Sequence, residues 1–389
     1  MSGLRTQGGA AVSASAALEG LQTPALLVRL ERVRANLARM RELLAPHGGF
    51  ERWRPHVKTA KTPSVQNLLL DAGLTQFKCA TTREARVLLE LARARGVSID
   101  LCVALALRGA NLARLAQLCD EHPRCRLSVL TEDAGHARSV RALAPRVGVW
   151  IDVDPRMGRS GVELDDGVRL ASVRDAAGDA LRGLHAYEGH VRHALPAERS
   201  AACEPLFDAL AHHMQTPQLR GLELVTSGTP TFEQALAFEP FRALRHRISP
   251  GIVVYWDHNS ASLGIEGFAV AATVLARVIS STRERVTLDA GSKSLDAAAG
   301  DPCVRVRGWP ELEAQRPSEE HLPLRARDGR VPAPGALLEL EPRHVCPMVN
   351  LAQRVVLLEG ERVLGSESVA ARGHDIDPCE SDVEARGAR

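Results

Sequence analysis

One segment of the chain places a lysine where its amine could do covalent chemistry. Residues 54–61 read Arg-Pro-His-Val-Lys-Thr-Ala-Lys, and Lys58 stands at the end of a strand-like run. An amine that is shielded from water loses its proton more easily than a free lysine and can attack a carbonyl carbon. We expect Lys58 to be shielded in this way and to form a Schiff base. A lone lysine at a strand end is more often a surface charge, so the assignment depends on its neighbours.

Two runs of small residues could bind an anion. The chain has Ser-Gly-Thr at residues 227–229 and Ser-Pro-Gly at residues 249–251. Small residues let backbone N–H groups approach a phosphate closely. The Ser-Gly-Thr run alone is more often a simple turn. If both runs follow neighbouring strands of a barrel, they form the usual phosphate site of that fold.

His344 and Cys346 form a candidate metal pair near the end of an alternating, strand-like segment. Residues i and i+2 of a strand point to the same face, so the imidazole and the thiolate could hold one cation. The soft thiolate favours zinc over magnesium. Two protein ligands leave positions open for a substrate oxygen. The alternative is a buried histidine beside a core cysteine.

Eight strand-like runs must position these residues. Amphipathic stretches of helical length lie between most of them, for example residues 83–95, 111–121 and 197–214. Strands that alternate with helices predict parallel pairing, and eight such units predict an α/β fold that closes into a (β/α)8 TIM barrel. The runs cover residues 52–58, 76–81, 99–105, 126–131, 147–154, 181–188, 221–228 and 246–254.

The pattern changes after about residue 260. Strand-like runs at 268–279, 286–289, 336–340 and 355–358 are separated by glycines, prolines and charges rather than by long helices. We therefore expect three parts. They are a flexible tail over residues 1–22, the barrel over residues 23–260, which begins with a strand at 24–28, and a β-rich C-terminal domain over residues 261–389.

Composition narrows the function classes. The 49 Lys+Arg nearly balance the 47 Asp+Glu, so no basic field favours nucleic acid. The eight cysteines include no Cys-x-x-Cys pair, which argues against a disulfide framework. The first 20 residues lack a signal-peptide core, and no apolar run reaches the length of a membrane span. We expect a cytoplasmic protein with a small-molecule substrate and neither a nucleic-acid nor a membrane partner.

Five motifs together resemble the D-threonine aldolase and D-serine dehydratase family of fold-type III pyridoxal-phosphate enzymes, whose barrel is related to that of alanine racemase. In this family a histidine usually stands where this chain has Ala60. Its zinc-dependent dehydratases carry His-x-Cys, whereas aldolases can carry His-x-Asp. The motifs are Thr-Pro-Ala-Leu-Leu-Val at 23–28, Arg-Pro-His-Val-Lys-Thr-Ala-Lys at 54–61, Gly-Arg-Ser-Gly-Val at 158–162, Leu-Asp-Ala-Gly-Ser-Lys at 288–293 and His-Val-Cys-Pro at 344–347.

The resemblance implies roles for single residues. Lys58 would hold pyridoxal 5'-phosphate, Arg159 would face the pyridine nitrogen and Tyr187 would lie beside the ring. An arginine does not readily give up a proton, so the nitrogen stays unprotonated and the ring is a weaker electron sink. A metal at His344 and Cys346 could be the second electrophile, with zinc favoured and manganese or magnesium as alternatives. The phosphate would be held by Ser227, Gly228, Thr229, Gly251 and Ile252.

The segment Tyr-Glu-Gly-His-Val-Arg-His at 187–193 looks like the Tyr-x-Gly-His form of aldolase-type members. His193 could take the β-hydroxyl proton of a substrate, which makes Lys58, Tyr187 and His193 the predicted catalytic residues. We favour a D-threonine aldolase-type lyase that cleaves D-β-hydroxy amino acids to glycine and an aldehyde. The alternatives are dehydration to a keto acid and ammonia, an amino-acid racemase and a non-catalytic pyridoxal-phosphate-binding protein. The resemblance also suggests a homodimer.

Overall fold

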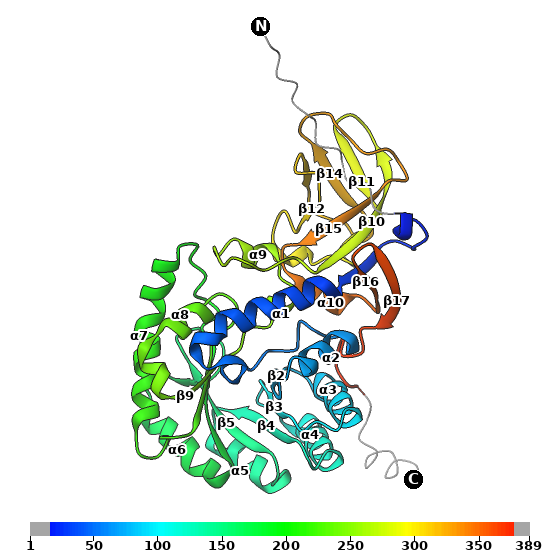
Figure 1. Cartoon of the computed structure of the whole chain (residues 1–389). Helices are drawn as coiled ribbons and strands as arrows, with labels where there is room; N and C mark the ends of the chain where they lie inside the picture. The colour runs from blue at the N-terminus through cyan, green and yellow to red at the C-terminus, as the bar shows by residue number, and fades with distance from the viewer. Residues whose placement is uncertain (1–15, 377–389) are drawn as a thin grey trace, which may run out of the picture. The chain divides into compact units, whose positions relative to one another are not determined.

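The computed structural model describes residues 16–376, which divide into two compact units (Figure 1). The unit that we call the barrel unit holds residues 33–256, 260–269 and 369–376. The other, called the β unit, holds residues 16–32, 257–259 and 270–368.

The barrel unit is built on a curled sheet of parallel strands that an irregular segment closes. Trp53 bridges Ile248 on one side of the gap, and His56 bridges Lys78 on the other. The Arg54 backbone N–H donates to the Ile248 carbonyl at 2.9 Å, and the Lys78 N–H donates to the Pro55 carbonyl at 2.9 Å. Because proline has no N–H, Pro55 cannot extend a regular ladder. The predicted TIM barrel is thus confirmed, with residues 53–56 in the place of its first strand.

The regular strands follow one another around the sheet in chain order, apart from the two-residue strand β6 (Val162–Glu163), which pairs with β5. They are β2 (Gln76–Cys79), β3 (Asp100–Val103), β4 (Arg126–Thr131), β5 (Gly148–Asp154), β7 (Leu181–Ala186), β8 (Glu223–Thr226) and β9 (Arg245–Ile248).

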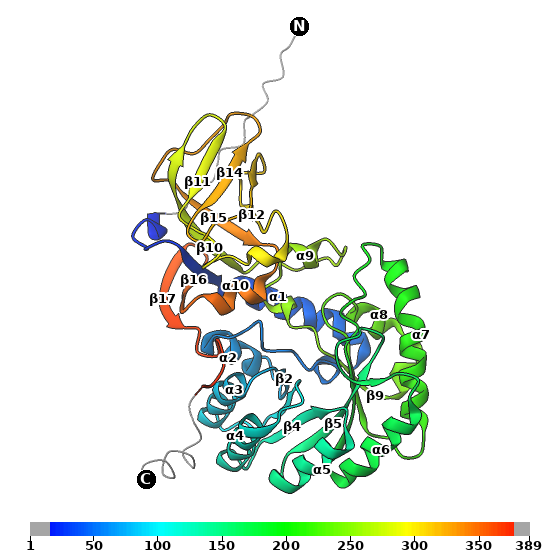
Figure 2. The ribbon, with the colours of Figure 1, turned by 180° about the vertical axis from the view of Figure 1, so that it is seen from behind.

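Helices cover the outside of the curled sheet (Figure 2). Their first turns carry the expected signals: Pro63 opens α2, Thr81 caps α3 by accepting from the Glu84 N–H, and Asp133 caps α5 by accepting from the His136 N–H. These helices are α1 (Leu30–Leu44), α2 (Pro63–Asp71), α3 (Thr82–Ala94), α4 (Gly109–Glu121), α5 (Ala134–Leu143), α6 (Gly167–Ala177), α7 (Pro196–Gln215) and α8 (Phe232–Ala237). The short helix α9 (His258–Ala261) follows and begins with residues of the β unit.

A group of paired charges fills the end of the barrel interior where the strands begin. The Arg54 side chain is fully buried and donates to Glu223 Oε1 through Nε at 3.1 Å and Nη2 at 2.9 Å. Its Nη1 donates to Asp100 Oδ1 at 2.9 Å, and Arg247 also pairs with Glu223. Asp100 and Glu223 are the first residues of β3 and β8. We call Arg54, Asp100, Glu223 and Arg247 the floor cluster.

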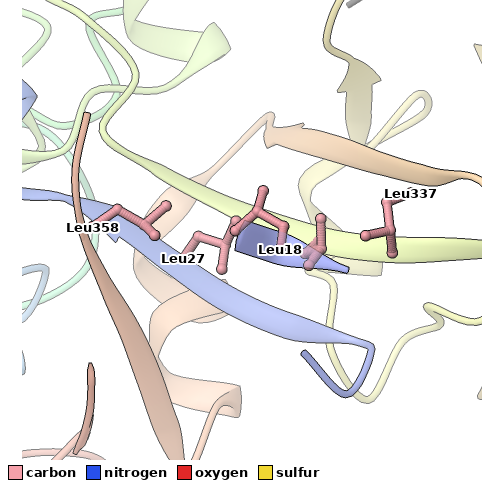
Figure 3. Close-up of a cluster of buried hydrophobic side chains, with 5 residues drawn as sticks. Leu18, Leu27, Leu337 and Leu358 are labelled. Carbon is pink, nitrogen blue, oxygen red and sulfur yellow. The ribbon is translucent and has the colours of Figure 1, made fainter. Parts of the chain in front are cut away.

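The β unit is a nine-stranded, mostly antiparallel sheet. Its core includes the labelled leucines of Figure 3, where Leu27 of β1 and Leu358 of β16 lie near Leu18 and Leu337. The β-rich prediction for this part of the chain is confirmed. The strands are β1 (Ala25–Arg29), β10 (Ala272–Ser281), β11 (Arg285–Leu288), β12 (Val304–Val306), β13 (Leu312–Ala314), β14 (Leu322–Ala326), β15 (Leu337–Pro342), β16 (Arg354–Glu359) and β17 (Arg362–Ser368).

The division into units differs from the predicted domains at both ends of the chain. Strand β1 pairs with β10 and β16, so the residues expected to open the barrel belong to the β unit instead. Within the expected tail, Leu18 is buried in the β-unit core, while residues 1–15 lie outside the described residues. Residues 369–376 return to the barrel unit, where the Thr82 hydroxyl donates to Asp375 at 3.0 Å.

Among the helices of residues 16–376, none combines the length and the apolar character that crossing a membrane requires.

Candidate active site

The loops after β8 and β9 lie side by side at the predicted phosphate site. The Ser249 N–H donates to the Ser227 carbonyl at 2.8 Å. Ser227 has a φ of 60°, the left-handed conformation that few residues other than glycine adopt. The Thr229 side chain is 3% exposed, and its hydroxyl has no hydrogen-bond partner among the described residues. Because an unpaired buried hydroxyl costs free energy, this atom fits a site that is completed by a ligand oxygen.

Two glycines allow close approaches around this site. A Cβ on Gly228 would lie 2.7 Å from the Tyr187 ring, and a Cβ on Gly251 would collide with the His56 carbonyl oxygen. The predicted phosphate residues therefore contact both the predicted ring neighbour and the segment that carries Lys58. Ile252 follows as the half-buried first residue of the 3-10 helix Ile252–Val254.

Two cations lie near the ring of Tyr187, the residue directly after β7. The Arg159 guanidinium carbon is 5.0 Å from the centroid of its ring, and the Lys78 Nζ is 5.9 Å from it. Cations at such distances are attracted to the electron-rich face of an aromatic ring. The structure thus brings Arg159 and Tyr187 together as expected from the sequence.

Lys58 is exposed, so the expectation that its amine is shielded from water is wrong. Its segment is fixed through the backbone: the Val57 N–H donates to the Lys78 carbonyl at 2.8 Å, and the Lys58 N–H donates to His56 Nδ1 at 3.3 Å. The backbone of this segment is thus bonded to β2, whereas Lys58 itself is exposed to solvent. An aldehyde that arrives from solution can reach the amine there.

Lys78, on β2, is a buried lysine that the sequence reasoning missed. Burial, reinforced by the charge of Lys58, lowers its pKa to about 8. Lysine is rare in this chain: only four occur among the 49 Lys+Arg, and three of them stand between residues 58 and 78. Arginine cannot lose its proton readily, whereas lysine can. This clustering is the sequence signal that could have identified Lys78.

A chain of hydrogen bonds runs from Lys78 across the barrel interior. Lys78 Nζ lies 3.2 Å from His185 Nε2, His185 Nδ1 lies 2.7 Å from Asp152 Oδ1, and the Ser160 hydroxyl donates to Asp152 Oδ2 at 2.9 Å. Burial and the charge of Lys78 lower the pKa of His185, so its ring is neutral. A neutral ring that donates through Nδ1 to a carboxylate accepts at Nε2. Lys78 is therefore the donor to His185.

His193, the predicted base, is exposed in the loop between β7 and α7. Its Nδ1 lies 3.9 Å from Glu198 Oε2, and its carbonyl oxygen accepts from Arg199 Nη1 at 2.8 Å. Within residues 16–376 we find no hydrogen bond, ion pair or ring contact that joins its imidazole to Lys58 or Tyr187. The role of His193 as the base therefore stays a prediction.

His344 and Cys346 belong to the β unit and do not lie on a strand. His344 is the extended residue before α10 (Val345–Leu351), and Cys346 is in the first turn of that helix. The strand argument for this pair is wrong, because β15 ends at Pro342 and the chain then turns into a helix. His344 Nδ1 lies 3.7 Å from Asp296 Oδ2. In the described part of the chain, no three His, Cys, Asp or Glu side chains are grouped as metal ligands.

Comparison with known proteins gives a consistent result over most of the chain. The family described as "Alanine racemase, N-terminal domain" matches residues 28–259, and "Putative serine dehydratase domain" matches residues 271–358. D-threonine aldolase from Arthrobacter sp is 30% identical over 373 residues, which cover 92% of this chain and 94% of that protein. D-threo-3-hydroxyaspartate dehydratase from Delftia sp. strain HT23 is 28% identical over 370 residues, covering 84% of this chain and 91% of that protein.

Among solved structures, D-threonine aldolase from Filomicrobium marinum superposes with a TM-score of 0.79 at 27% identity, covering 92% of this chain and 97% of that one. The matches to the barrel, to the β unit and to the sequence motifs thus all indicate the same family. The chain belongs to the fold-type III family of alanine racemase-like barrels, together with the lyases D-threonine aldolase and D-threo-3-hydroxyaspartate dehydratase.

Proposed function

We propose that this protein is a pyridoxal-phosphate-dependent lyase of D-β-hydroxy amino acids and that it cleaves them, like a D-threonine aldolase, to glycine and an aldehyde. One observation carries the proposal. The unpartnered Thr229 hydroxyl and the left-handed Ser227 lie in loops that contact Tyr187 and the segment of Lys58. These features suit a phosphate anchored beside a reactive amine.

Residues of the barrel unit would bind the cofactor, and others would transfer protons. When bound, pyridoxal phosphate supplies an aldehyde for an amine and a ring that withdraws electrons from the substrate. Lys58 is the covalent anchor, since its exposed amine is open to an aldehyde from solution. The hydroxyls of Ser227 and Thr229 and the backbone beside Gly251 and Ile252 hold the phosphate. Arg159 keeps a fixed positive charge next to Tyr187 and would be the partner of the ring nitrogen.

We assign the proton of the substrate hydroxyl to His193. Its imidazole is exposed in the loop after β7, and Glu198 is the nearest carboxylate to it. An exposed imidazole can take a proton directly or through water.

We further propose that His344 and Cys346 hold a divalent cation, with zinc favoured over manganese or magnesium. Sulfur and imidazole nitrogen are the donors that zinc prefers. The Asp296 carboxylate lies 3.7 Å from His344 Nδ1 and adds a negative charge beside this imidazole. The cation would act as a Lewis acid toward a substrate oxygen.

The product analysis of D-threonine tests the reaction. Holoprotein should release glycine and acetaldehyde from D-threonine, more slowly after treatment with a chelator, and neither from L-threonine. Ammonia and a keto acid without glycine would contradict the aldolase proposal. Formation of L-allo-threonine alone, the product of inversion at the α-carbon, would instead identify a racemase, and bound cofactor without any turnover would identify a binding protein.

Dehydration is the second candidate because the chain carries the His-x-Cys pair and a dehydratase is among its relatives. The substitution His344→Ala tests the metal in both reactions: the visible absorbance of the cofactor should stay while turnover falls at least tenfold. His321→Ala, which removes an exposed histidine of the same unit, is the matched control. Sedimentation of the holoprotein tests the homodimer that we also propose.

A further inference from the structure

We propose that Lys78 is a positioning residue of this site and that the chain Lys78–His185–Asp152 holds a proton inside the barrel that sets the charge beneath Tyr187 and beside Lys58. The inference rests on the proposed function, because it takes the cofactor on Lys58 as the group that senses this charge. The two lysines lie on neighbouring segments of the barrel wall, joined through the Val57 and Lys78 backbones.

The Lys78 side chain contacts both the buried His185 and the ring of Tyr187. Its side chain is 4% exposed, its Nζ donates to His185 Nε2 at 3.2 Å, and the same atom lies 5.9 Å from the centre of the Tyr187 ring. His185 and Asp152 are buried as well. Ser160, at the far end of the chain, is exposed and connects Asp152 to the loop that carries Arg159. A proton on Lys78 is thus held near both the buried pair His185–Asp152 and the site residue Tyr187.

The pairing of Lys78 differs from that of the neighbouring buried lysine. Lys61 Nζ has a carboxylate of its own, Glu84 Oε1, at 2.7 Å. No carboxylate in the described residues hydrogen-bonds to Lys78 Nζ, and Asp152 already accepts from His185 and Ser160. The second buried carboxylate nearby, Glu188, accepts from the Thr231 hydroxyl through Oε1, and its Oε2 has no hydrogen-bond partner among the described residues. The ammonium form of Lys78 is therefore incompletely compensated.

The groups that face Lys78 do not correct this shortage. Burial and Lys58 favour the neutral amine, whereas Glu188 and Asp152 favour the ammonium, and the resulting pKa is about 8. Cys102 also faces the amine and raises the pKa of Lys78, while burial raises the pKa of its own thiol to about 12. Lys78 therefore changes its charge near neutral pH. The facing groups are His56, Lys58, Cys102, Asp152, His185 and Glu188.

The charge of Lys78 acts on the site through short distances. Below pH 8 the ammonium repels a positive charge on Lys58 and lies against the Tyr187 ring. Above pH 8 that repulsion disappears, while the hydrogen bond to His185 is kept, because a neutral amine also donates. Only the charge changes, and the contacts stay in place.

The test is a pH titration of the visible absorbance of holoprotein between pH 6 and pH 10. The wild-type spectrum should change with pH, and in Lys78→Met the midpoint should move by at least one pH unit or the transition should vanish. Lys78→Arg should likewise lack a transition in this range, because it fixes the charge. Lys293→Met, which removes an exposed lysine of the β unit, should leave the midpoint where it is.

A second variant covers the case in which Lys78→Met does not fold. In His185→Leu the ammonium loses its acceptor, so the midpoint should fall. Normal cofactor uptake with an unchanged midpoint in Lys78→Met, or in His185→Leu if only that variant folds, would overturn this inference alone. Failure of the wild-type chain to take up pyridoxal phosphate would overturn the proposed function, and this inference with it.

Discussion

Two groups of residues bury cations in the same barrel: the floor cluster and the hydrogen-bonded series Lys78–His185–Asp152, which we call the Lys78 chain. Carboxylates pair with the cations of the first group, whereas a neutral imidazole pairs with the cation of the second. Arg54 has two carboxylate partners, Glu223 and Asp100, and Arg247 shares the first of them. Within residues 16–376, the hydrogen-bond partner of the Lys78 side chain is the neutral imidazole of His185, and the carboxylate of Asp152 lies on the other side of that ring.

The difference shows in the pKa values. Burial alone would lower the pKa of Arg54, but Glu223 and Asp100 reverse the effect and raise it. For Lys78 burial prevails, and the pKa falls. A cation with full pairing keeps its charge at any physiological pH, whereas an incompletely paired lysine can switch. The floor therefore stabilises the fold, and the Lys78 chain is suited to a site.

Breaking the floor should have the largest effect. Arg54→Met leaves buried carboxylates without their main partner and should lower the free energy of unfolding by about 3–5 kcal/mol, measured by urea denaturation at pH 7. Arg126→Met is the matched control, because Arg126 pairs with the same Asp100 but is exposed; it should cost less than about 1 kcal/mol. Equal losses in both variants would remove the distinction between buried and exposed pairing.

Removing the other buried cation should have the opposite sign. The pKa of Lys78 is about 8 in the folded chain against 10.5 as a reference, so between these values the unfolded chain binds more protons and stability rises with pH. Lys78→Met lacks this penalty and should be more stable than wild type at pH 7, by on the order of 3 kcal/mol, with convergence near pH 10. Urea denaturation of the cofactor-free proteins at pH 7, 8.5 and 10 measures it. Destabilisation at pH 7 would show that Lys78 is held like Arg54.

The loop after β9 offers a test in which steric fit, rather than charge, determines cofactor affinity. In Gly251→Ala the new Cβ meets the backbone carbonyl of His56, so the loop must move away from Lys58. We expect cofactor affinity to fall about tenfold, or about 1.4 kcal/mol, by absorbance titration. Gly167→Ala, at the first position of α6 with open space around it, should leave affinity unchanged. Wild-type affinity in Gly251→Ala would remove this loop from the phosphate site.

The smallest effect is expected at the exposed end of the Lys78 chain. Ser160→Ala removes one donor to Asp152, which should change the free energy of unfolding by less than about 1 kcal/mol. It should also leave the pH dependence caused by Lys78 in place. If Ser160→Ala abolished that dependence, the titrating proton would be shared by the hydrogen-bonded series Lys78, His185, Asp152 and Ser160 rather than held by Lys78 alone.

The sequence predicted the barrel because each strand is followed by a helix, a local pattern. It could not predict that residues 25–29 pair with β10 and β16, since partners distant in the chain leave no local mark. Lys78 was missed for a related reason. A parallel barrel buries both faces of a strand, so period-two patterns do not separate the interior from the helix side. The side chains of Lys58 and His344 depart from expectation because solvent exposure and a helix start depend on surroundings that the motif does not contain.

Strand β1 has a consequence for the order of folding. It is paired on both sides by strands that leave the ribosome much later, since Leu27 faces Thr273 and Val356. The barrel residues that lie between β1 and β10 in the sequence can all be synthesised before either partner strand of β1 exists. Sheet assembly in the β unit thus has to follow barrel synthesis, and a nascent chain halted near residue 260 would expose an unpaired apolar strand at its N-terminal end.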